Sequence, residues 1–235
     1  MKRSTAEIEA IRKACRVTDA TFKHILPHLV ENVTEKAIVK KINKYIRRHS
    51  DGLAFKTIAA FGENSAEIHH QFPTERKLKK GDIIMLDFGT KINGLCSDMT
   101  RTLFFGKAST EQKRMYDTVL QAQQKAIEQL NNLAIEQSVI KIRALDIDIT
   151  ARGYILSKGY PAFPHGLGHG IGRRVHMAPL LSPKSKAYLK SGMVFSVEPG
   201  IYIQDFGGVR IEDLILLNGN KVEILTKSPK KLIWL

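Results

Sequence analysis

Two aspartates belong to one predicted β-hairpin. Residues 81–102 read GDIIMLDFGTKINGLCSDMTRT, in which an apolar run ends at Asp87 and a second strand carries Asp98. Asn93-Gly94 is a strong signal for a two-residue hairpin turn, and this turn places position 87 opposite position 100. Because side chains alternate between the faces of a sheet, Asp87 and Asp98 should be diagonal neighbours on one face, about 7–8 Å apart at Cα.

Two carboxylates in that arrangement repel each other across an apolar sheet. Either a cation lies between them or at least one is protonated. One metal ion, or a pair roughly 3.5–4 Å apart, fits the gap. The alternative is that Asp87 only ends a strand and forms a turn, while Asp98 pairs with Arg101 or Lys91. The two aspartates by themselves do not decide between these interpretations.

A second hairpin repeats this design. Residues 192–217 read GMVFSVEPGIYIQDFGGVRIEDLILL, where an apolar strand ends at Glu198, a turn is predicted at Gly207-Gly208, and the return strand brings Glu212. Acids on otherwise apolar strands are costly unless they are paired. The repetition suggests an internal duplication, in which each half consists of two helices and a hairpin and contributes acids.

Three histidines lie within residues 164–179, which read PHGLGHGIGRRVHMAP: His165, His169 and His176. A His-x-x-x-His pair on a helix would suggest a zinc protease, but the glycines at every second position from 166 to 172 make a helix unfavourable. Alternating glycines instead predict a strand or loop that something approaches closely. The segment can therefore present imidazoles with little bulk around them, and histidines merely packed in a loop are the alternative.

The elements that position these residues predict an α+β fold, because helices and strands come in groups and do not alternate regularly. Ser4 with Glu7 forms a capping-box signal for a first helix. Pro73 excludes a helix around His69 and His70 and predicts an extended segment there. The predicted helices cover residues 4–28, from 32 or 34 to near 49–52, 110–130 and 139–157. The segment before the first hairpin is predicted as a strand at 55–61 and a loop at 62–65.

The bulk composition indicates a cytoplasmic globular protein. The 235 residues are 43% hydrophobic, which is enough for a substantial core. Only Cys15 and Cys96 are present, which argues against a disulfide framework and for a reducing compartment. We find neither a signal peptide nor an apolar run of the roughly 18–20 residues that a membrane span needs. The net charge of +14 is compatible with a nucleic-acid or ribosome partner, but the basic residues are scattered and form no stripe interleaved with aromatics.

The motifs DFGTKINGLCSDMTRT, HGLGHGIGRRVH, VEPGIYI and GVRIED together resemble the M24 metallopeptidase family, which includes methionine aminopeptidases, Xaa-Pro aminopeptidases and prolidases. The resemblance covers nearly the whole chain. It implies the pita-bread fold, an α+β fold with a pseudo-two-fold curved antiparallel sheet covered by helices. It also implies that residues 1–235 form a single catalytic domain, without the front domain that most Xaa-Pro peptidases carry.

The resemblance further implies a centre of two divalent metal ions. Its ligands would be Asp87, Asp98, His169, Glu198 and Glu212. Four carboxylates and one imidazole are mainly hard donors, which suit manganese and also cobalt, zinc or iron(II). Their negative charges roughly balance two divalent cations. In such a site a hydroxide that bridges the metals attacks the scissile carbonyl of a peptide.

Other residues receive roles from the same resemblance. Glu198 would act as the general base, and His176 would donate a hydrogen bond to the tetrahedral intermediate. His70 would face the substrate, and Arg210 would orient the last ligand or contact the substrate.

Three further positions are less defined by the resemblance. His165 stays open between a role in the site and a role in packing. His69 has no counterpart in the family motif, and it is expected to have no special role. Met177 stands where the family usually has an acid, which could lower the basicity of His176.

Two branches of the family fit the motifs. HQFPTERKL (70–78) and GIYIQDFGGVRIED (200–213) look like the Xaa-Pro branch. Gly172-Arg173 looks slightly like the methionine branch, whose cysteine-bearing pocket segment is absent from residues 55–65. We therefore expect a peptidase that removes the N-terminal residue from Xaa-Pro peptides. The alternatives are a methionine aminopeptidase that acts on nascent chains and a catalytically silent binding module of the same fold; the oligomeric state stays open.

Overall fold

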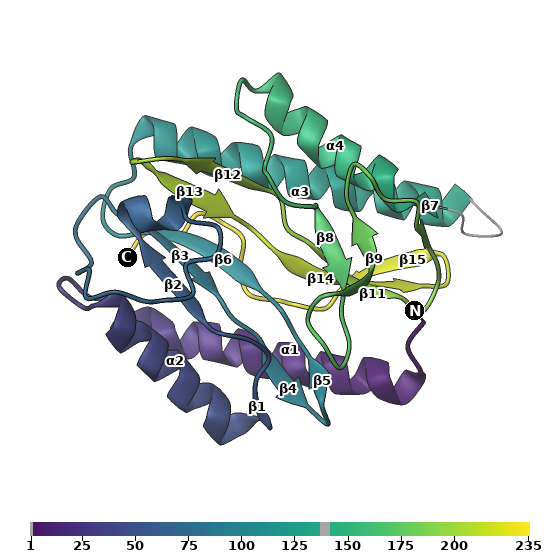
Figure 1. Ribbon diagram of the computed structural model, residues 1–235, viewed down its shortest axis with the longest axis horizontal. Helices are drawn as coiled ribbons and strands as arrows, with labels where there is room; N and C mark the ends of the chain where they lie inside the picture. The colour runs from purple at the N-terminus through teal and green to yellow at the C-terminus, as the bar shows by residue number, and fades with distance from the viewer. Residues whose placement is uncertain (1, 137–141) are drawn as a thin grey trace.

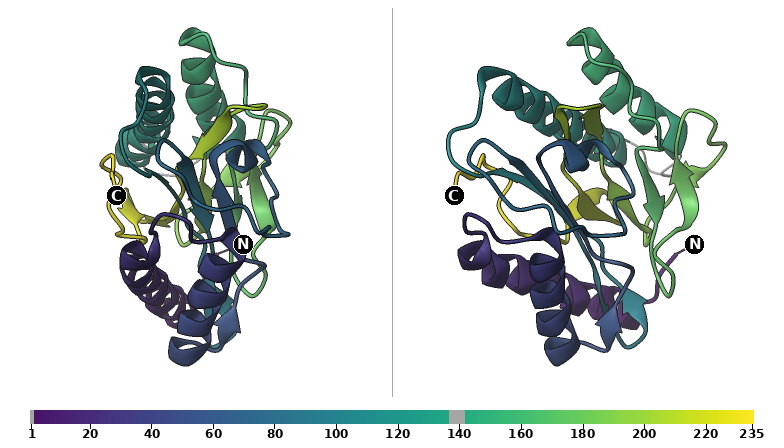
Figure 2. Two further views of the ribbon diagram at one scale, coloured as in Figure 1. Left: turned by 90° about the vertical axis from the view of Figure 1, so that its left-hand side faces the viewer. Right: turned by 60° about the vertical axis from the view of Figure 1, so that its left-hand side comes forward.

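The computed structural model describes residues 2–136 and 142–235, and its α+β architecture is the one expected. Two pairs of helices enclose the strands, with α1 and α2 on one side and α3 and α4 on the other (Figure 1; Figure 2). The helices are α1 (Thr5–Ile25), α2 (Glu35–His49), α3 (Thr110–Glu136) and α4 (Ala144–Ser157), with the short 3₁₀ helices η1 (Leu26–His28) and η2 (Gly62–Ala66). None of the helices in these described ranges is long and apolar enough to cross a membrane.

Local sequence signals explain where the first two helices begin. Ser4 Oγ accepts a hydrogen bond from the Glu7 amide at 3.2 Å, and the Glu7 carboxylate accepts one from the Ser4 amide at 2.9 Å. This is the predicted capping box. Thr34 caps α2 in the same way, since its Oγ1 accepts from the Ala37 amide at 3.2 Å. The face that α2 buries against the strands repeats every fourth residue: Ile38, Ile42 and Ile46.

Among the described residues the strands form five sheets, and the two that contain the most residues are called the larger sheets. The larger sheets have the orders β2-β3-β6 and β15-β14-β11-β8-β9. Their strands are β2 (Ile58–Phe61), β3 (Ile83–Asp87), β6 (Thr100–Phe104), β8 (Gly168–Gly170), β9 (Met177–Leu181), β11 (Val194–Val197), β14 (Asp213–Asn218) and β15 (Lys221–Ile224). The small sheets are built from β1 (Gly52–Leu53), β4 (Thr90–Ile92), β5 (Leu95–Cys96), β7 (Ile142–Arg143), β10 (Tyr188–Leu189), β12 (Gly200–Ile203) and β13 (Gly207–Arg210).

The first hairpin has the predicted register. Asp87 in β3 lies opposite Thr100 in β6. Asn93 and Gly94 connect β4 to β5 with φ angles of 51° and 71°. Asparagine and glycine tolerate this left-handed conformation better than other residues, which is why they specify the turn.

The second hairpin has the same antiparallel form and meets the first one. Its strands β11 and β14 pair with Val197 opposite Asp213. The Glu212 amide, just before β14, donates to the Thr100 carbonyl in β6 at 3.1 Å. The two larger sheets are therefore joined at the ends of the strands that carry the acids.

The predicted turn at Gly207-Gly208 is wrong. Both glycines belong to β13, and the turn lies just before them, where the Phe206 amide donates to the Ile203 carbonyl at 3.1 Å. A Cβ atom at Gly208 would overlap the carbonyl oxygen of Ser65. Glycine is needed at position 208 because η2 packs directly on the strand, whereas Gly207, directly after the turn, also has a positive φ of 135°.

Other element boundaries also differ from the predictions. The predicted loop at 62–65 is the 3₁₀ helix η2, and the third helix ends at 136 and not at 130. The fourth helix begins at Ala144, after β7; the predicted start at 139 lies outside the described residues. As Pro73 requires, there is no helix in the described segment around His69 and His70, although the chain turns at residues 68–69 and is not simply extended.

Candidate metal centre

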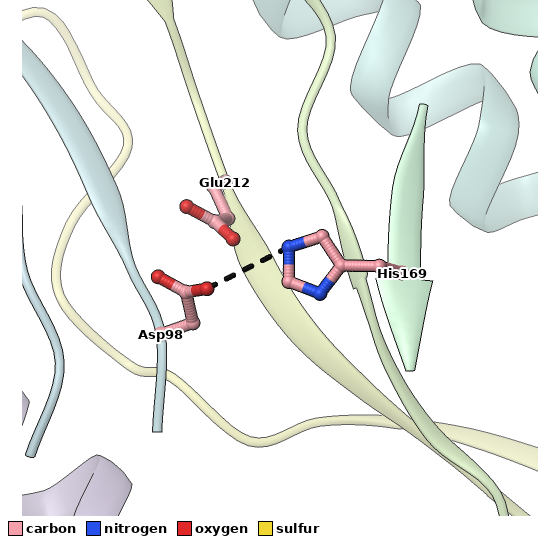
Figure 3. Close-up of side chains that lie close together, drawn as sticks. All are labelled: Asp98, His169 and Glu212. Atoms are coloured by element: carbon pink, nitrogen blue, oxygen red, sulfur yellow. Dashed lines mark ion pairs between the residues drawn. The ribbon is translucent and has the colours of Figure 1, made fainter. Parts of the chain in front are cut away.

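Asp98, His169 and Glu212 converge on one point. Figure 3 shows their side chains pointing toward one another from three separate segments. One ligand atom of each residue lies within 4.8 Å of the other two, and Asp98 Oδ2 is 3.7 Å from His169 Nε2. The three residues are only 2–8% exposed. Asp98 lies between β5 and β6, His169 is in β8, and Glu212 directly precedes β14.

Glu198 and Asp87 border this group. Glu198 follows β11, and its Oε1 lies 3.2 Å from His169 Nε2 and accepts a hydrogen bond from Ser196 Oγ at 2.9 Å. Asp87 ends β3, and its Oδ2 accepts from Arg210 Nη2 at 2.8 Å. The cavity described below is lined by all of the predicted ligands: Asp87, Asp98, His169, Glu198 and Glu212.

The close approach of β8 to β11 explains the glycines beside His169. A Cβ atom at Gly168 would overlap the carbonyl of Ser196, and one at Gly170 would overlap the carbonyl of Ala178. The alternating glycines thus allow β8 to pack between its neighbours, as the sequence predicted. The Ser196 hydroxyl accepts from the His169 amide at 3.0 Å and so fixes both His169 and Glu198.

Burial and mutual repulsion shift the protonation of the acids. Burial raises the pKa of Asp98 and of Glu212 well above their usual values, and neighbouring carboxylates raise both further. Burial also raises the pKa of Asp87, although Arg210 opposes this shift. In Glu198 the effect of burial is outweighed by the hydrogen bond and charge of His169, so that its pKa falls to about 2. The basic side chains of the centre therefore do not neutralise all of its buried carboxylates.

Two oxygen atoms indicate whether the candidate centre suits a cation. Within residues 2–136 and 142–235, Asp87 Oδ1 and Glu212 Oε1 are the buried side-chain atoms without a hydrogen-bond partner. Buried polar atoms are nearly always paired. Both are carboxylate oxygens, the donor type that hard divalent cations prefer. The residues present therefore fit a metal centre.

A cavity of about 360 Å³ opens beside the acids. This volume is in the range of small-molecule sites. His176 lines it, and the His176 ring lies edge-on to the His169 ring with centroids 4.4 Å apart. Burial, together with the charge of His169, lowers the pKa of His176. A neutral imidazole thus stands next to the acids at the cavity surface.

A hydrogen-bond chain connects His165 to the candidate centre. His165 lines the cavity, and its Nε2 lies 2.9 Å from Tyr202 Oη, which accepts from Arg210 Nη1 at 3.0 Å. Arg210 Nε donates to Thr100 Oγ1 at 3.1 Å, and Thr100 Oγ1 donates to Glu212 Oε2 at 2.7 Å. His165 therefore belongs to the site.

Three residues of the site were not identified from the sequence: Ser196, Thr100 and Tyr202. Only Thr100 carried a usable signal, because the predicted register places it opposite Asp87. Ser196 and Tyr202 lie on apolar strands with no spacing that distinguishes them from other residues there.

The two adjacent histidines are placed differently from the prediction. His70 is 4% exposed, and its two ring nitrogens lie 2.9 Å from Glu35 Oε2 and 2.7 Å from Glu67 Oε2. Among the described residues that line the cavity, the histidine from this segment is His69 and not His70. The carboxylate of Glu35 draws the His70 ring into the protein interior and away from the cavity.

The paired hairpins, the buried acids and the adjoining cavity define a fold of the metallopeptidase type. The sequence matches the model of metallopeptidase family M24 over residues 9–218, and the chain belongs to this family. The expected family and α+β pita-bread fold are thereby confirmed.

Similar proteins include Xaa-Pro dipeptidases. The Xaa-Pro dipeptidase of Pyrococcus horikoshii is 36% identical over 233 residues, which are 98% of this chain and 64% of the relative. The solved structure of an Xaa-Pro dipeptidase from Bacillus anthracis is 37% identical with a TM-score of 0.91, and that of a dipeptidase from Pyrococcus horikoshii is 41% identical with a TM-score of 0.93. Both comparisons cover 100% of this chain and 64% of the other chain. The chain thus spans less than two thirds of the length of these relatives.

Proposed function

We propose that residues 1–235 form the catalytic domain of a metal-dependent peptidase that removes the N-terminal residue from Xaa-Pro peptides. The observation that carries this proposal is the convergence of Asp98, His169 and Glu212 within 4.8 Å beside a cavity. The branch is supported by the relatives named Xaa-Pro dipeptidases. The Xaa-Pro motifs at 70–78 and 200–213 support the same choice.

Two divalent metal ions would occupy the centre, with manganese the best match to its hard donors and cobalt, zinc and iron(II) as further candidates. The residues that would hold them are Asp87, Asp98, His169, Glu198 and Glu212. When bound, such ions act as Lewis acids on a peptide carbonyl and lower the pKa of water. The orphaned oxygens of Asp87 and Glu212 would gain partners.

The residues of the chain itself would move the protons. Glu198 lies beside the other predicted ligands at the cavity, where it would accept a proton from the attacking water and later pass it to the leaving amine. Ser196 holds Glu198 in place through a 2.9 Å hydrogen bond. His176 presents its ring at the cavity and would donate a hydrogen bond to the oxyanion. Arg210 would orient Asp87, whose Oδ2 it contacts at 2.8 Å.

Two peptides test the substrate class. The protein is freed of metal with a chelator, reloaded with Mn²⁺, Co²⁺ or Zn²⁺, and incubated with a peptide that has proline second and with a Met-Ala peptide. Mass spectrometry of the products should show release of the first residue from the proline peptide only. Cleavage of only Met-Ala would instead identify a methionine aminopeptidase. Cleavage of neither peptide by protein shown to bind metal would identify a silent binding module.

A further inference from the structure

One wall of the cavity comes from residues 67–74, which we call the lip. Its residues Ile68, His69 and Gln71 line the cavity. A tight turn, in which the Gln71 amide donates to the His69 carbonyl at 2.6 Å, orients these side chains. His70 lies in the same turn but is buried. The lip therefore has a face toward the cavity and a face toward the interior of the protein.

The interior face of the lip is attached to Glu35, the first residue of α2. Glu35 is 0% exposed, and its carboxylate accepts five hydrogen bonds from groups on three segments. The donors are Phe61 N at 2.9 Å, Asn64 Nδ2 at 2.9 Å, His70 Nε2 at 2.9 Å, Thr74 N at 2.9 Å and Thr74 Oγ1 at 2.7 Å. A buried carboxylate needs such partners, and the start of a helix also favours a negative charge. The carboxylate thus joins the end of β2, η2 and the lip.

The other end of the lip is attached to the candidate centre through Arg210. Arg210 Nη1 donates to the Ile68 carbonyl at 3.4 Å, while Arg210 Nη2 donates to Asp87 Oδ2 at 2.8 Å. The lip is consequently held between a predicted metal ligand on one side and Glu35 on the other. A displacement of His70 would therefore change the position of the cavity wall relative to the centre.

We propose that Glu35 is a positioning residue for the peptide substrate, which acts through His70 and Thr74 to hold the lip so that His69 faces the peptide. This inference rests on the proposed function, because the peptide is the molecule that the cavity would bind. Glu35 touches no part of the cavity itself. His69 is exposed, and it lines the same cavity as His176. The two imidazoles would contact acceptor groups of the same peptide.

The attachment is sensitive to pH. The hydrogen bond to Glu35 is the largest contribution that raises the pKa of His70 to about 8, against burial and with help from Glu67. The charged groups that face His70 are Glu35 from α2 and Glu67 from the lip itself. A protonated His70 donates to both carboxylates, and a neutral one can donate to only one of them. The lip should therefore loosen as the pH rises through about 8.

Glu67→Gln and Glu35→Gln test this arrangement, with Glu75→Gln as the matched control. Glu67 is largely exposed, so its substitution leaves the core intact, and Glu75 is an exposed residue that forms an ion pair with Lys36 on the surface. NMR titration should show a lower His70 pKa in Glu67→Gln than in the wild type. In both Glu67→Gln and Glu35→Gln the alkaline fall of kcat/KM should move to lower pH. In Glu35→Gln the KM for an Xaa-Pro dipeptide should rise about tenfold or more while kcat changes less.

Separate outcomes distinguish this inference from the proposed function. If the wild type cleaves Xaa-Pro peptides but Glu67→Gln keeps the wild-type pH profile, the positioning role is refuted. Should Glu35→Gln fail to fold, Glu67→Gln still decides. If His69→Gln leaves KM and kcat unchanged in a folded, metal-binding protein, His69 does not face the peptide. A wild type that cleaves no Xaa-Pro peptide refutes the proposed function itself, and the NMR titration of His70 still reports on the attachment.

Discussion

Removing the charge of Asp98 should stabilise the metal-free protein while abolishing its stabilisation by metal. Burial and then the nearby carboxylates of Glu212, Asp87 and Glu198 raise the pKa of Asp98 well above its usual value. The folded state consequently binds a proton at Asp98 more tightly than the unfolded state does. Stability falls as the pH rises from the unfolded pKa toward the raised folded pKa. Asp98→Asn keeps the shape of the side chain and removes this penalty.

The size of the metal effect follows from the length of the chain. A ligand at 100 times its Kd stabilises the folded state by about 2.7 kcal/mol. With an unfolding entropy of about 2.1 cal/mol/K per residue, a chain of 235 residues has roughly 0.5 kcal/mol/K in total, so that Mn²⁺ should raise the Tm of the wild type by about 5 °C. In Asp98→Asn this rise should disappear, because the centre loses a carboxylate next to His169 and Glu212.

Calorimetry checks both the stabilisation of the metal-free variant and the loss of its stabilisation by metal. Chelator-treated protein is measured with and without Mn²⁺ at several pH values between about 5.5 and 8.5. The difference in Tm between Asp98→Asn and the wild type should grow in favour of the variant as the pH rises. Taking this difference cancels the titration of shared groups that do not interact with Asp98. Asp117→Asn, at an exposed position on α3, is the control and should behave as the wild type. The reasoning fails if folded Asp98→Asn is less stable than the wild type at pH 8, or if it keeps the rise with Mn²⁺.

Three further substitutions test other parts of the structure. Glu198→Gln should abolish turnover in a peptide-cleavage assay while the circular dichroism spectrum stays native; full activity would eliminate the general-base role. His176→Ala should lower kcat by about 10²–10³ in steady-state kinetics, and an unchanged kcat would remove it from the mechanism. Asp213→Asn should lower the free energy of unfolding in urea by about 3–5 kcal/mol. It leaves the 1% exposed Arg101 without the 2.7 Å partner that neutralises it, and a loss below about 1 kcal/mol would show that Lys230 or solvent compensates.

The first hairpin shows how much local sequence can specify. The turn residues Asn93-Gly94 fix the connection, and the strict alternation of a strand then fixes which residues share a face. The observed pairing of Asp87 with Thr100 follows from these two rules alone. The same rules failed at Gly207-Gly208, because glycine serves both turns and close packing, and only the position of η2 against β13 distinguishes the two uses.

The residue types of the candidate centre could be predicted from the sequence. The residues that hydrogen-bond to the predicted site residues could not. Acids on apolar strands and an imidazole among glycines are unusual enough to stand out in the sequence. Ser196 and Tyr202 have no such signal, since a serine or tyrosine in a strand is ordinary. Their importance arises because β11 and β12 place them against Glu198 and Arg210.

The amino-acid sequence by itself determined the family and the register of the first hairpin, and it predicted the donor set. The register could be predicted because turn chemistry and side-chain alternation act over a few residues. Only the tertiary structure decided which groups meet. Asp98, His169 and Glu212 come from three distant segments and lie within 4.8 Å of one another. The choice between His69 and His70 depends on Glu35, which precedes them by more than 30 residues in the sequence. A buried carboxylate must find donors wherever the fold supplies them, and that requirement cannot be read from the local sequence around either histidine.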